Sequence, residues 1–231
     1  TGSFTYQWKK SVNGGFIWTD IASASSTTYA ETNNLTTTTQ YKRVATSGSF
    51  GSIESNIVIV TVLPDFVSGV ISSTQTVCYL GNPLPLTGTN PTGADGSYTF
   101  QWQSSGDNTN WSNIFGEKDA TLQPQPSIAS TYFRRIASNA FCNASVISNP
   151  LLITVRDKVT KPSVSISDFY CKNTNVTLNI ANPNSSTYKW YNSFNIFLSE
   201  GSQISFSNLT ADFLVYVKSI LSNGCASEPL D

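Results

Sequence analysis

Residues 2–8 of the chain read GSFTYQW, and residues 96–102 read GSYTFQW. In both stretches aromatic residues alternate with polar ones, and each stretch ends on a tryptophan, Trp8 or Trp102. A period of two residues is typical of a β-strand with one buried face. Because the pattern returns after about 94 positions, the sequence indicates a chain built from repeated β-modules.

The same register continues through the rest of the repeated unit. WTDI at 18–21 returns as WSNI at 111–114, YKRVA at 41–45 returns as FRRIA at 133–137, and SNIVIVTV at 55–62 returns as SNPLLITV at 148–155. A more divergent third copy has YKWY at 188–191 as its tryptophan strand. We therefore predict three modules: 1–62, lacking its opening strands; 63–156, complete; and 157–231, lacking its closing strand.

Turn residues divide each module into about seven short strands, the pattern of a Greek-key β-sandwich. In the middle module we expect strands near 67–73, 84–88, 98–104, 111–114, 121–123, 131–138 and 149–155. The prediction is an all-β chain of tandem sandwiches arranged end to end. Trp8, Trp102 and Trp190 occupy the alternating aromatic strands, so each is expected to bury its ring in the core of its own module.

The four cysteines occur as one pair in each of the last two modules. Each pair brackets the tryptophan strand of its module, so we predict two disulfides, Cys78–Cys142 and Cys171–Cys225, each joining two loops at one end of a sandwich. Two thiols without histidine do not complete a tetrahedral zinc site. Disulfides indicate an oxidising, extracellular compartment.

Composition excludes several function classes. The chain has 231 residues, a net charge of −1, 12% charged residues and no histidine. Histidine-based triads, dyads and metal sites are therefore impossible, and no basic cluster is present to bind nucleic acid. No apolar run is long enough to span a membrane. We expect no enzyme, cofactor, metal, nucleic-acid partner or membrane insertion, and the opening residues, which do not resemble a signal peptide, lead us to expect an internal fragment.

Three stretches carry a resemblance to a known class of protein: 77–105 (VCYLGNPLPLTGTNPTGADGSYTFQWQSS), 110–124 (NWSNIFGEKDATLQP) and 131–149 (TYFRRIASNAFCNASVISN). They resemble the immunoglobulin-like repeats of very large Bacteroidota surface adhesins, above all the SprB-type gliding-motility adhesins. The third module resembles the Ig/PKD-like modules of the same exported proteins. In the first module Phe50-Gly51 replaces Phe141-Cys142, so the resemblance does not extend to its disulfide.

The resemblance implies tandem immunoglobulin-like sandwiches in a protein exported by the type IX secretion system and held at the outer cell surface. It implies a long stalk that a motor moves along the cell while the stalk links the cell to the substratum. Its partners are then neighbouring modules of the same polypeptide, surface polysaccharide, and the motility and secretion machinery through other parts of the parent protein. The ligand and the number of modules stay open.

Two other functions remain open at this point. One is a carbohydrate-binding or spacer module of a secreted polysaccharide-degrading enzyme, for which exposed aromatics are needed; Trp111 with Phe115, and Phe194 with Phe197, are the candidate surface contacts. The other is a static surface-layer protein. Asp65 and Asp157 recur at the two module junctions, but one carboxylate at each falls short of the six to eight oxygens that calcium takes.

Overall fold

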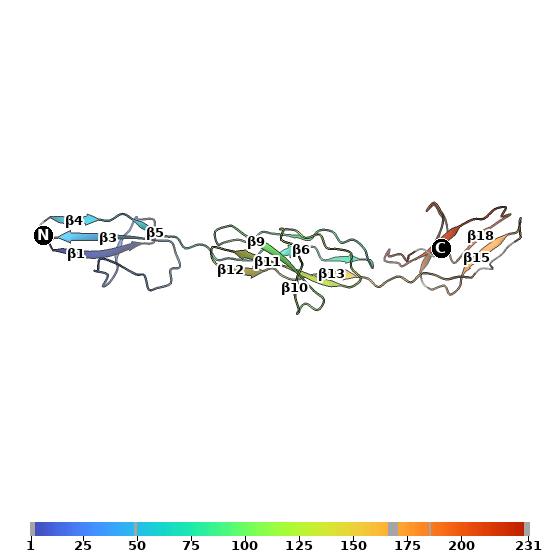
Figure 1. Ribbon diagram of the computed structural model, residues 1–231, viewed down its shortest axis with the longest axis horizontal. Helices are drawn as coiled ribbons and strands as arrows, with labels where there is room; N and C mark the ends of the chain where they lie inside the picture. The colour runs from blue at the N-terminus through green and yellow to red at the C-terminus, as the bar shows by residue number, and fades with distance from the viewer. Residues whose placement is uncertain (1–2, 49, 166–170, 185, 229–231) are drawn as a thin grey trace. The chain divides into compact units, whose positions relative to one another are not determined.

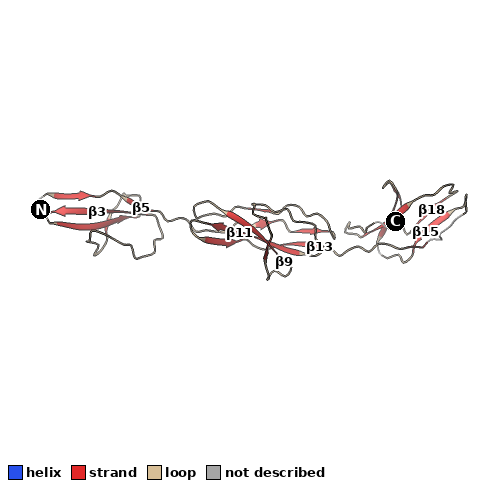
Figure 2. Cartoon of the chain, viewed as in Figure 1, coloured by secondary structure: helices blue, strands red, loops and turns tan. Residues whose placement is uncertain are grey.

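The computed structural model describes residues 3–48, 50–165, 171–184 and 186–228. These ranges contain nineteen β-strands and no helix (Figure 2). The chain groups into two compact units. Unit 1 comprises residues 1–67, 92–98 and 139–144, and unit 2 comprises residues 68–91, 99–138 and 145–231.

Unit 1 is built on one five-stranded sheet, drawn in blue in Figure 1. Its strands are β1 (Phe4–Ser11), β2 (Thr19–Asp20), β3 (Thr39–Ser47), β4 (Gly51–Glu54) and β5 (Val58–Val60). The sheet order is β2-β1-β3-β4, and β5 also pairs with β3. The predicted strand around Trp8 is therefore β1, which pairs antiparallel with β3 over its whole length.

The aromatic face of this sheet is only partly covered. No second sheet packs on it among the residues of unit 1 that the structure describes. A loop over 21–38 lies there instead, and its Tyr29 contacts Trp8 with 5.9 Å between ring centres. All three residues of β5 are exposed. Side chains on the aromatic face of unit 1 therefore lie in a half-buried environment rather than in a core closed by a second sheet.

One carboxylate fixes that loop. Glu31 accepts hydrogen bonds at Oε2 from the hydroxyls of Tyr29 and Tyr41, each at 3.0 Å. Its Oε1 accepts from the backbone N–H groups of Thr32 and Asn33, each at 3.1 Å. These donors, the Asn33 backbone first among them, lower the pKa of Glu31 to about 2. Burial and the bond to Glu31 raise the pKa of Tyr41 to about 12, so this hydroxyl stays protonated and donating.

We expect acid to loosen this loop. A folded pKa below the unfolded value contributes stability that is present above about pH 4.5 and is lost as the pH falls through about 2. Glu31→Gln removes the charge at every pH. The difference in unfolding temperature between wild type and Glu31→Gln, followed by circular dichroism, should therefore narrow from pH 5 to pH 2. A constant difference would show that the Glu31 carboxylate does not titrate as described.

Residues 64–67 are held by a backbone hydrogen bond and a ring contact within unit 1. The carbonyl of Pro64 accepts from the Ala94 N–H at 2.9 Å, and Phe66 stacks on Tyr98 with ring centres 5.5 Å apart. Gly93 has φ +86°, and a Cβ there would lie 1.7 Å from the carbonyl oxygen of Asp65. Only glycine fits this close approach.

The first part of unit 2 contains a six-stranded and a two-stranded sheet. Its strands are β6 (Ile71–Ser72), β7 (Gln75–Val77), β8 (Thr87–Gly88), β9 (Thr99–Ser105), β10 (Ser112–Asn113), β11 (Thr131–Asn139), β12 (Ala144–Ile147) and β13 (Leu151–Val155). The large sheet has the order β10-β9-β11-β13-β7, with β12 on β11, and β6 pairs with β8. The core comprises Ile71, Leu86, Trp102, Leu122, Phe133, Leu151 and Ile153.

Two strands of this part, β7 and β12, were not predicted. Both have only three or four residues, QTV and ASVI, which is too short for the alternation on which the other strands were recognised. The strand expected at 121–123 is reduced to a single bridge between Leu122 and Leu86. The parallel pairing of β7 with β13 brings an early and a late strand of the module together.

The remainder of unit 2 is a second sandwich, coloured from orange to red in Figure 1. Its strands are β14 (Val164–Ser165), β15 (Val176–Ile180), β16 (Thr187–Asn192), β17 (Phe197–Glu200), β18 (Gln203–Phe206) and β19 (Val215–Ile220). They form the sheets β14-β15-β18 and β17-β16-β19. The buried core is drawn from both sheets: Val176, Leu178, Ile180, Tyr188, Trp190, Ile204 and Val217. The chain is all-β, as predicted.

Candidate functional site

One disulfide is present among the described cysteines, and it joins Cys78 to Cys225. Their Cα atoms are 5.5 Å apart although the residues are 147 positions apart in the sequence. Cys142 and Cys171 are free and exposed. The predicted pairs Cys78–Cys142 and Cys171–Cys225 are therefore wrong, although a disulfide is present.

Strand directions explain why Cys78 does not meet Cys142. Gln75 of β7 lies beside Ile153 of β13, which lies beside Thr131 at the start of β11. From these paired residues β7 runs toward Cys78. β11 runs in the opposite direction for nine residues and ends at the turn that contains Cys142. Nine residues of strand span about 30 Å, whereas a disulfide needs Cα atoms within about 7 Å. The two cysteines follow opposite ends of the strands.

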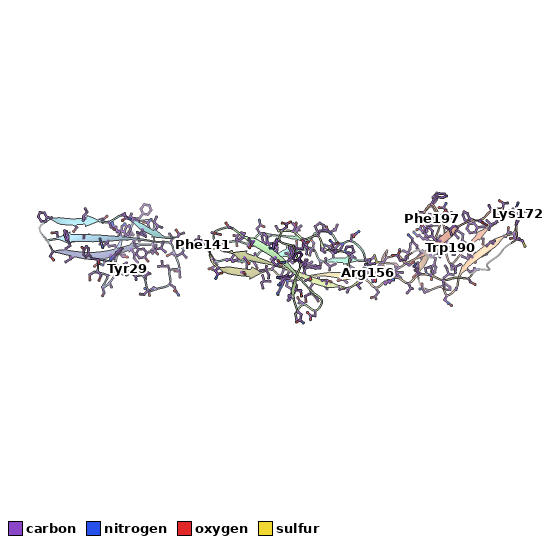
Figure 3. The ribbon with its side chains drawn as sticks, in the orientation of Figure 1. Tyr29, Phe141, Arg156, Lys172, Trp190 and Phe197 are labelled. Carbon is purple, nitrogen blue, oxygen red and sulfur yellow. A yellow bond between two sulfur atoms is a disulfide. The ribbon has the colours of Figure 1, made fainter. Side chains whose placement is uncertain are left out.

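The same geometry separates Cys171 from Cys225. Cys171 lines a pocket together with the segment 209–214, which leads into β19. Cys225 lies beyond the other end of β19, where its carbonyl accepts from the Leu221 N–H at 2.9 Å. Lys172, the neighbour of Cys171, is at the tip of this part of the chain in Figure 3. A six-residue strand, about 20 Å long, therefore lies between these two cysteines.

The surroundings of the disulfide hold both of its ends in place. The Arg156 N–H donates to the Val77 carbonyl at 2.9 Å, and the Leu80 N–H donates to the Ser127 carbonyl at 3.0 Å. On the other side Ser219 Oγ donates to the Thr160 carbonyl at 2.8 Å. Cys225 is only 2% exposed. The bond therefore joins two hydrogen-bonded segments rather than two free loops.

We expect the full chain to expose two thiols when it is unfolded in guanidinium without reductant. Ellman's reagent counts them, and non-reducing peptide mapping should recover Cys78 linked to Cys225. As a control, a Cys142→Ser/Cys171→Ser variant should show no thiol and the same linked peptide. A peptide that links Cys78 to Cys142 would contradict the pairing in the structure.

The three tryptophans differ in their burial. Trp102 is 0% exposed and Trp190 is 1% exposed, and their indole N–H groups donate to the carbonyls of Asp119 and Gly201 at 2.9 and 3.0 Å. Trp8 is half-buried instead of lying in a closed core. Its ring is on the partly covered sheet face of unit 1, which is why the expectation of full burial does not hold there.

An arginine accompanies each of the two repeated tryptophans. The Arg135 guanidinium lies 4.5 Å from the Phe100 ring centre and 5.7 Å from that of Trp102. It donates to the carbonyls of Ala120 and Thr89, and burial lowers its pKa. The equivalent Arg43 lies 5.9 Å from the Trp8 ring centre. The arginine is therefore part of the packing around the tryptophan.

The predicted surface pair Trp111 and Phe115 does not form a platform. The Arg134 guanidinium covers the Trp111 ring at 4.2 Å, and Trp111 is half-buried, whereas Phe115 is fully exposed. Phe194 is also isolated: it lies 82% exposed in the turn between β16 and β17. Among the described residues, no ring contact joins Trp111, Phe115 or Phe194 to another surface aromatic.

Phe197, in contrast, belongs to a row of aromatics that sequence reasoning missed. Tyr191 of β16 stacks on Tyr216 of β19 with ring centres 5.3 Å apart, and Phe197 of β17 meets Tyr191 edge-on at 6.0 Å. We call Phe197, Tyr191 and Tyr216 the aromatic row. It lies on the sheet face opposite to Trp190, because buried and partly exposed residues alternate along β16 and β19 (Figure 3).

One cation lies beside the aromatic row. Lys218 Nζ is 5.7 Å from the Tyr191 ring centre and 5.6 Å from that of Tyr216. No carboxylate pairs with it among the described residues. The row and Lys218 together offer ring edges, one positive charge and two phenol hydroxyls, of which that of Tyr216 donates to Asn195 Oδ1. The alternation in YKWY and in VYVKSI at 215–220 was the available signal for this arrangement.

A pocket of about 590 Å³ adjoins the core of the last sandwich. Its lining is mainly apolar and includes Val176, Leu178, Trp190, Phe206, Val215 and Val217. The described residues contain no cluster of three or more His, Cys, Asp or Glu that could hold a metal. No long apolar helix that could cross a membrane occurs among them either.

Exposed carboxylates of the middle module act as loop caps. Asp107 accepts from the N–H groups of Asn110 and Thr109 at 2.7 and 2.8 Å, and these bonds lower its pKa. Asp95 accepts from the Ser97 N–H at 2.9 Å, which lowers its pKa as well. Both carboxylates are thus ionised and engaged by their own loops.

Known protein families match successive parts of the chain. Two successive matches, at residues 1–64 and 67–157, are to the family described as "Domain of unknown function (DUF8696)". The chain belongs to the DUF8696 family. Residues 160–230 of this DUF8696 chain match a second family, "Ig-like domain CHU_C associated". The chain is thus an immunoglobulin-like β-sandwich protein, and its disulfide is typical of proteins that fold in an oxidising compartment.

The chain is also similar to solved structures of other proteins. The FN1–FN3 domains of chicken CNTN1 are 10% identical to the DUF8696 chain, with a TM-score of 0.31, and the match covers 98% of this chain and 87% of that one. Fibronectin(III)-like modules of Clostridium thermocellum CbhA are 9% identical, with a TM-score of 0.31 and coverages of 73% and 90%. No curated protein matches the chain.

Proposed function

We propose that the chain is a segment of the stalk of a long, repetitive cell-surface adhesin. The observation that carries this proposal is the succession of three domain matches, two to DUF8696 over 1–64 and 67–157 and one to an Ig-like family over 160–230. Many sandwiches in series project a binding end away from a surface, so length itself is part of the function. The described residues have structural roles in cores, loop caps and a disulfide, which suits a spacer rather than an enzyme.

The finer proposal is an adhesin of the SprB type in a gliding bacterium. The parent protein would then be exported by the type IX secretion system, held on the outer membrane exterior and moved along the cell. Its partners would be neighbouring modules of the same polypeptide and surface polysaccharide. The motility and secretion machinery would bind other parts of the parent, and neither nucleic acid nor membrane insertion is involved. The sequence stretches of the middle module support this proposal.

Antibody-coated beads on living cells test it. Beads carrying antibody against residues 63–156 should bind cells of the source organism and travel along them. Beads that bind and stay still would support a static surface-layer protein instead. Beads that never bind, while the same antibody detects the protein in culture medium, would favour a secreted enzyme module.

Carbohydrate binding is a second candidate, favoured by the aromatic row with Lys218. Aromatic side chains pack on sugar rings, and an ammonium group without a carboxylate partner attracts uronic acids. Affinity electrophoresis of the full chain through gels with alginate tests this. Tyr216→Ala should abolish the retardation, and Phe115→Ala, at an isolated exposed ring, should leave it unchanged. Equal retardation of both variants, or none of the wild type, would contradict this function.

A further inference from the structure

We propose that the Cys78–Cys225 disulfide is a covalent bypass for tension. When the chain is pulled from its two ends, the load reaches the disulfide at Cys78 and leaves it at Cys225. The backbone between these residues is then not part of the load path. This property follows from the connectivity of the chain itself and holds whatever surface the parent protein occupies.

The bypassed segment contains most of the folded structure of unit 2. It includes every strand from β8 to β19. All core residues of the last sandwich lie inside it, and so do all buried core residues of the preceding one except Ile71. Strands β8 to β19 are therefore shielded from a stretching force that acts on the chain ends, whereas β6 and β7, which precede Cys78, stay in the load path.

Without the bond the load would cross a weak connection. It would enter the middle module through β6 and β7 and leave it through the end of β13, since Arg156 follows β13 directly. Of these strands, β7 and β13 are parallel and share three residue pairs, Gln75–Ile153, Thr76–Thr154 and Val77–Val155. Pulling one strand at its start and the other at its end slides them past each other. A covalent bond placed directly after β7 carries the load from Cys78 to Cys225, so the load is not transferred across this pairing to β13.

The position of the bond suits this role. Cys78 follows β7 immediately, and Cys225 lies five residues beyond the end of β19. The disulfide prevents the 147 positions that it spans from extending, and these would be about 500 Å long when stretched. The residues outside the loop can contribute only about 300 Å. The oxidised chain should therefore stretch to less than half of its full length.

Single-molecule stretching at constant force tests the proposal. The full chain is attached by its two ends, first without reductant, and is expected to extend by no more than about 300 Å. Dithiothreitol is then added to the stretched molecule. It transfers two electrons and two protons to the disulfide, which becomes two thiols while dithiothreitol closes its own disulfide. A further single release of about 500 Å should follow.

Serine variants supply matched controls. Cys78→Ser should release the full length without reductant, and Cys142→Ser, which removes a free thiol, should behave as wild type. Because the step on adding dithiothreitol is measured in the wild-type chain, the test does not depend on whether Cys78→Ser folds. Full extension of the oxidised wild type would overturn the proposal. Two separate releases of about 200 Å would also overturn it, because they would indicate disulfides within single modules.

Discussion

Replacing Trp102 by alanine is expected to lower the local free energy of unfolding by about 3 to 5 kcal/mol. The indole is completely buried in the core around Ile71, Leu86 and Phe133. Its removal leaves a cavity that the two surrounding sheets cannot close fully, and it leaves the Asp119 carbonyl without its donor at 2.9 Å. Hydrogen exchange of peptides from β9 and β11 measures the local value.

Trp8→Ala is the matched control, because Trp8 occupies the same repeat position and is only partly buried. Its indole N–H donates to the Ser26 carbonyl at 3.0 Å, so the same type of bond is lost. With less apolar surface buried, we expect a cost of about 1 to 2 kcal/mol. Equal losses at the two sites would mean that burial does not distinguish them, and a loss below about 1 kcal/mol at Trp102 would place that ring outside the core.

Arg135→Ala is expected to cost about 3 kcal/mol, the second largest effect. The Arg135 side chain is 2% exposed and donates to two backbone carbonyls, those of Thr89 and Ala120, from separate strand connections. Truncation leaves both carbonyls without this donor and removes the guanidinium from above Phe100. Hydrogen exchange of peptides that span 86–92 and 117–122 should therefore accelerate together.

Two further variants separate charge from geometry. Arg135→Lys keeps the charge, but a single ammonium group cannot donate to both carbonyls as the planar guanidinium does. We therefore expect an intermediate loss of unfolding free energy. Arg43→Ala, at the equivalent half-buried site, removes one bond to the Thr27 carbonyl and should cost about 1 kcal/mol or less. If Arg135→Lys were as stable as wild type, the two-carbonyl connection would not be the reason for the arginine.

The fold could be predicted because its long strands alternate strongly. β9 carries aromatic and polar residues at a period of two, and β11 repeats the YKRVA stretch of β3 as FRRIA, so these strands and the all-β class followed from sequence. β7 and β12 were missed because their pairing depends on neighbours in the sheet rather than on their own residues. Trp8 and Trp102 lie in similar local sequences, GSFTYQW and GSYTFQW, yet the covering of their sheets differs.

The cysteine pairing could not be obtained from the repeat alone. Spacing shows that each pair brackets a tryptophan strand, but it does not show toward which end of the sheet a cysteine leads. That direction depends on β7 lying parallel to β13. The aromatic row was missed for a related reason: Phe197 was noticed in the sequence, while Tyr191 and Tyr216 become its neighbours only through the register of β16 with β17 and β19.

Extracellular proteases cut first at exposed loops of folded proteins. The loop over 106–110 is exposed throughout, and it lies between Cys78 and Cys225. A cut there would divide a simple linear chain into two separate fragments. Here the fragments would stay covalently joined, because one contains Cys78 and the other contains Cys225. The same holds for a single cut anywhere in the 147-position loop, so one cut in the backbone does not release a fragment of the protein.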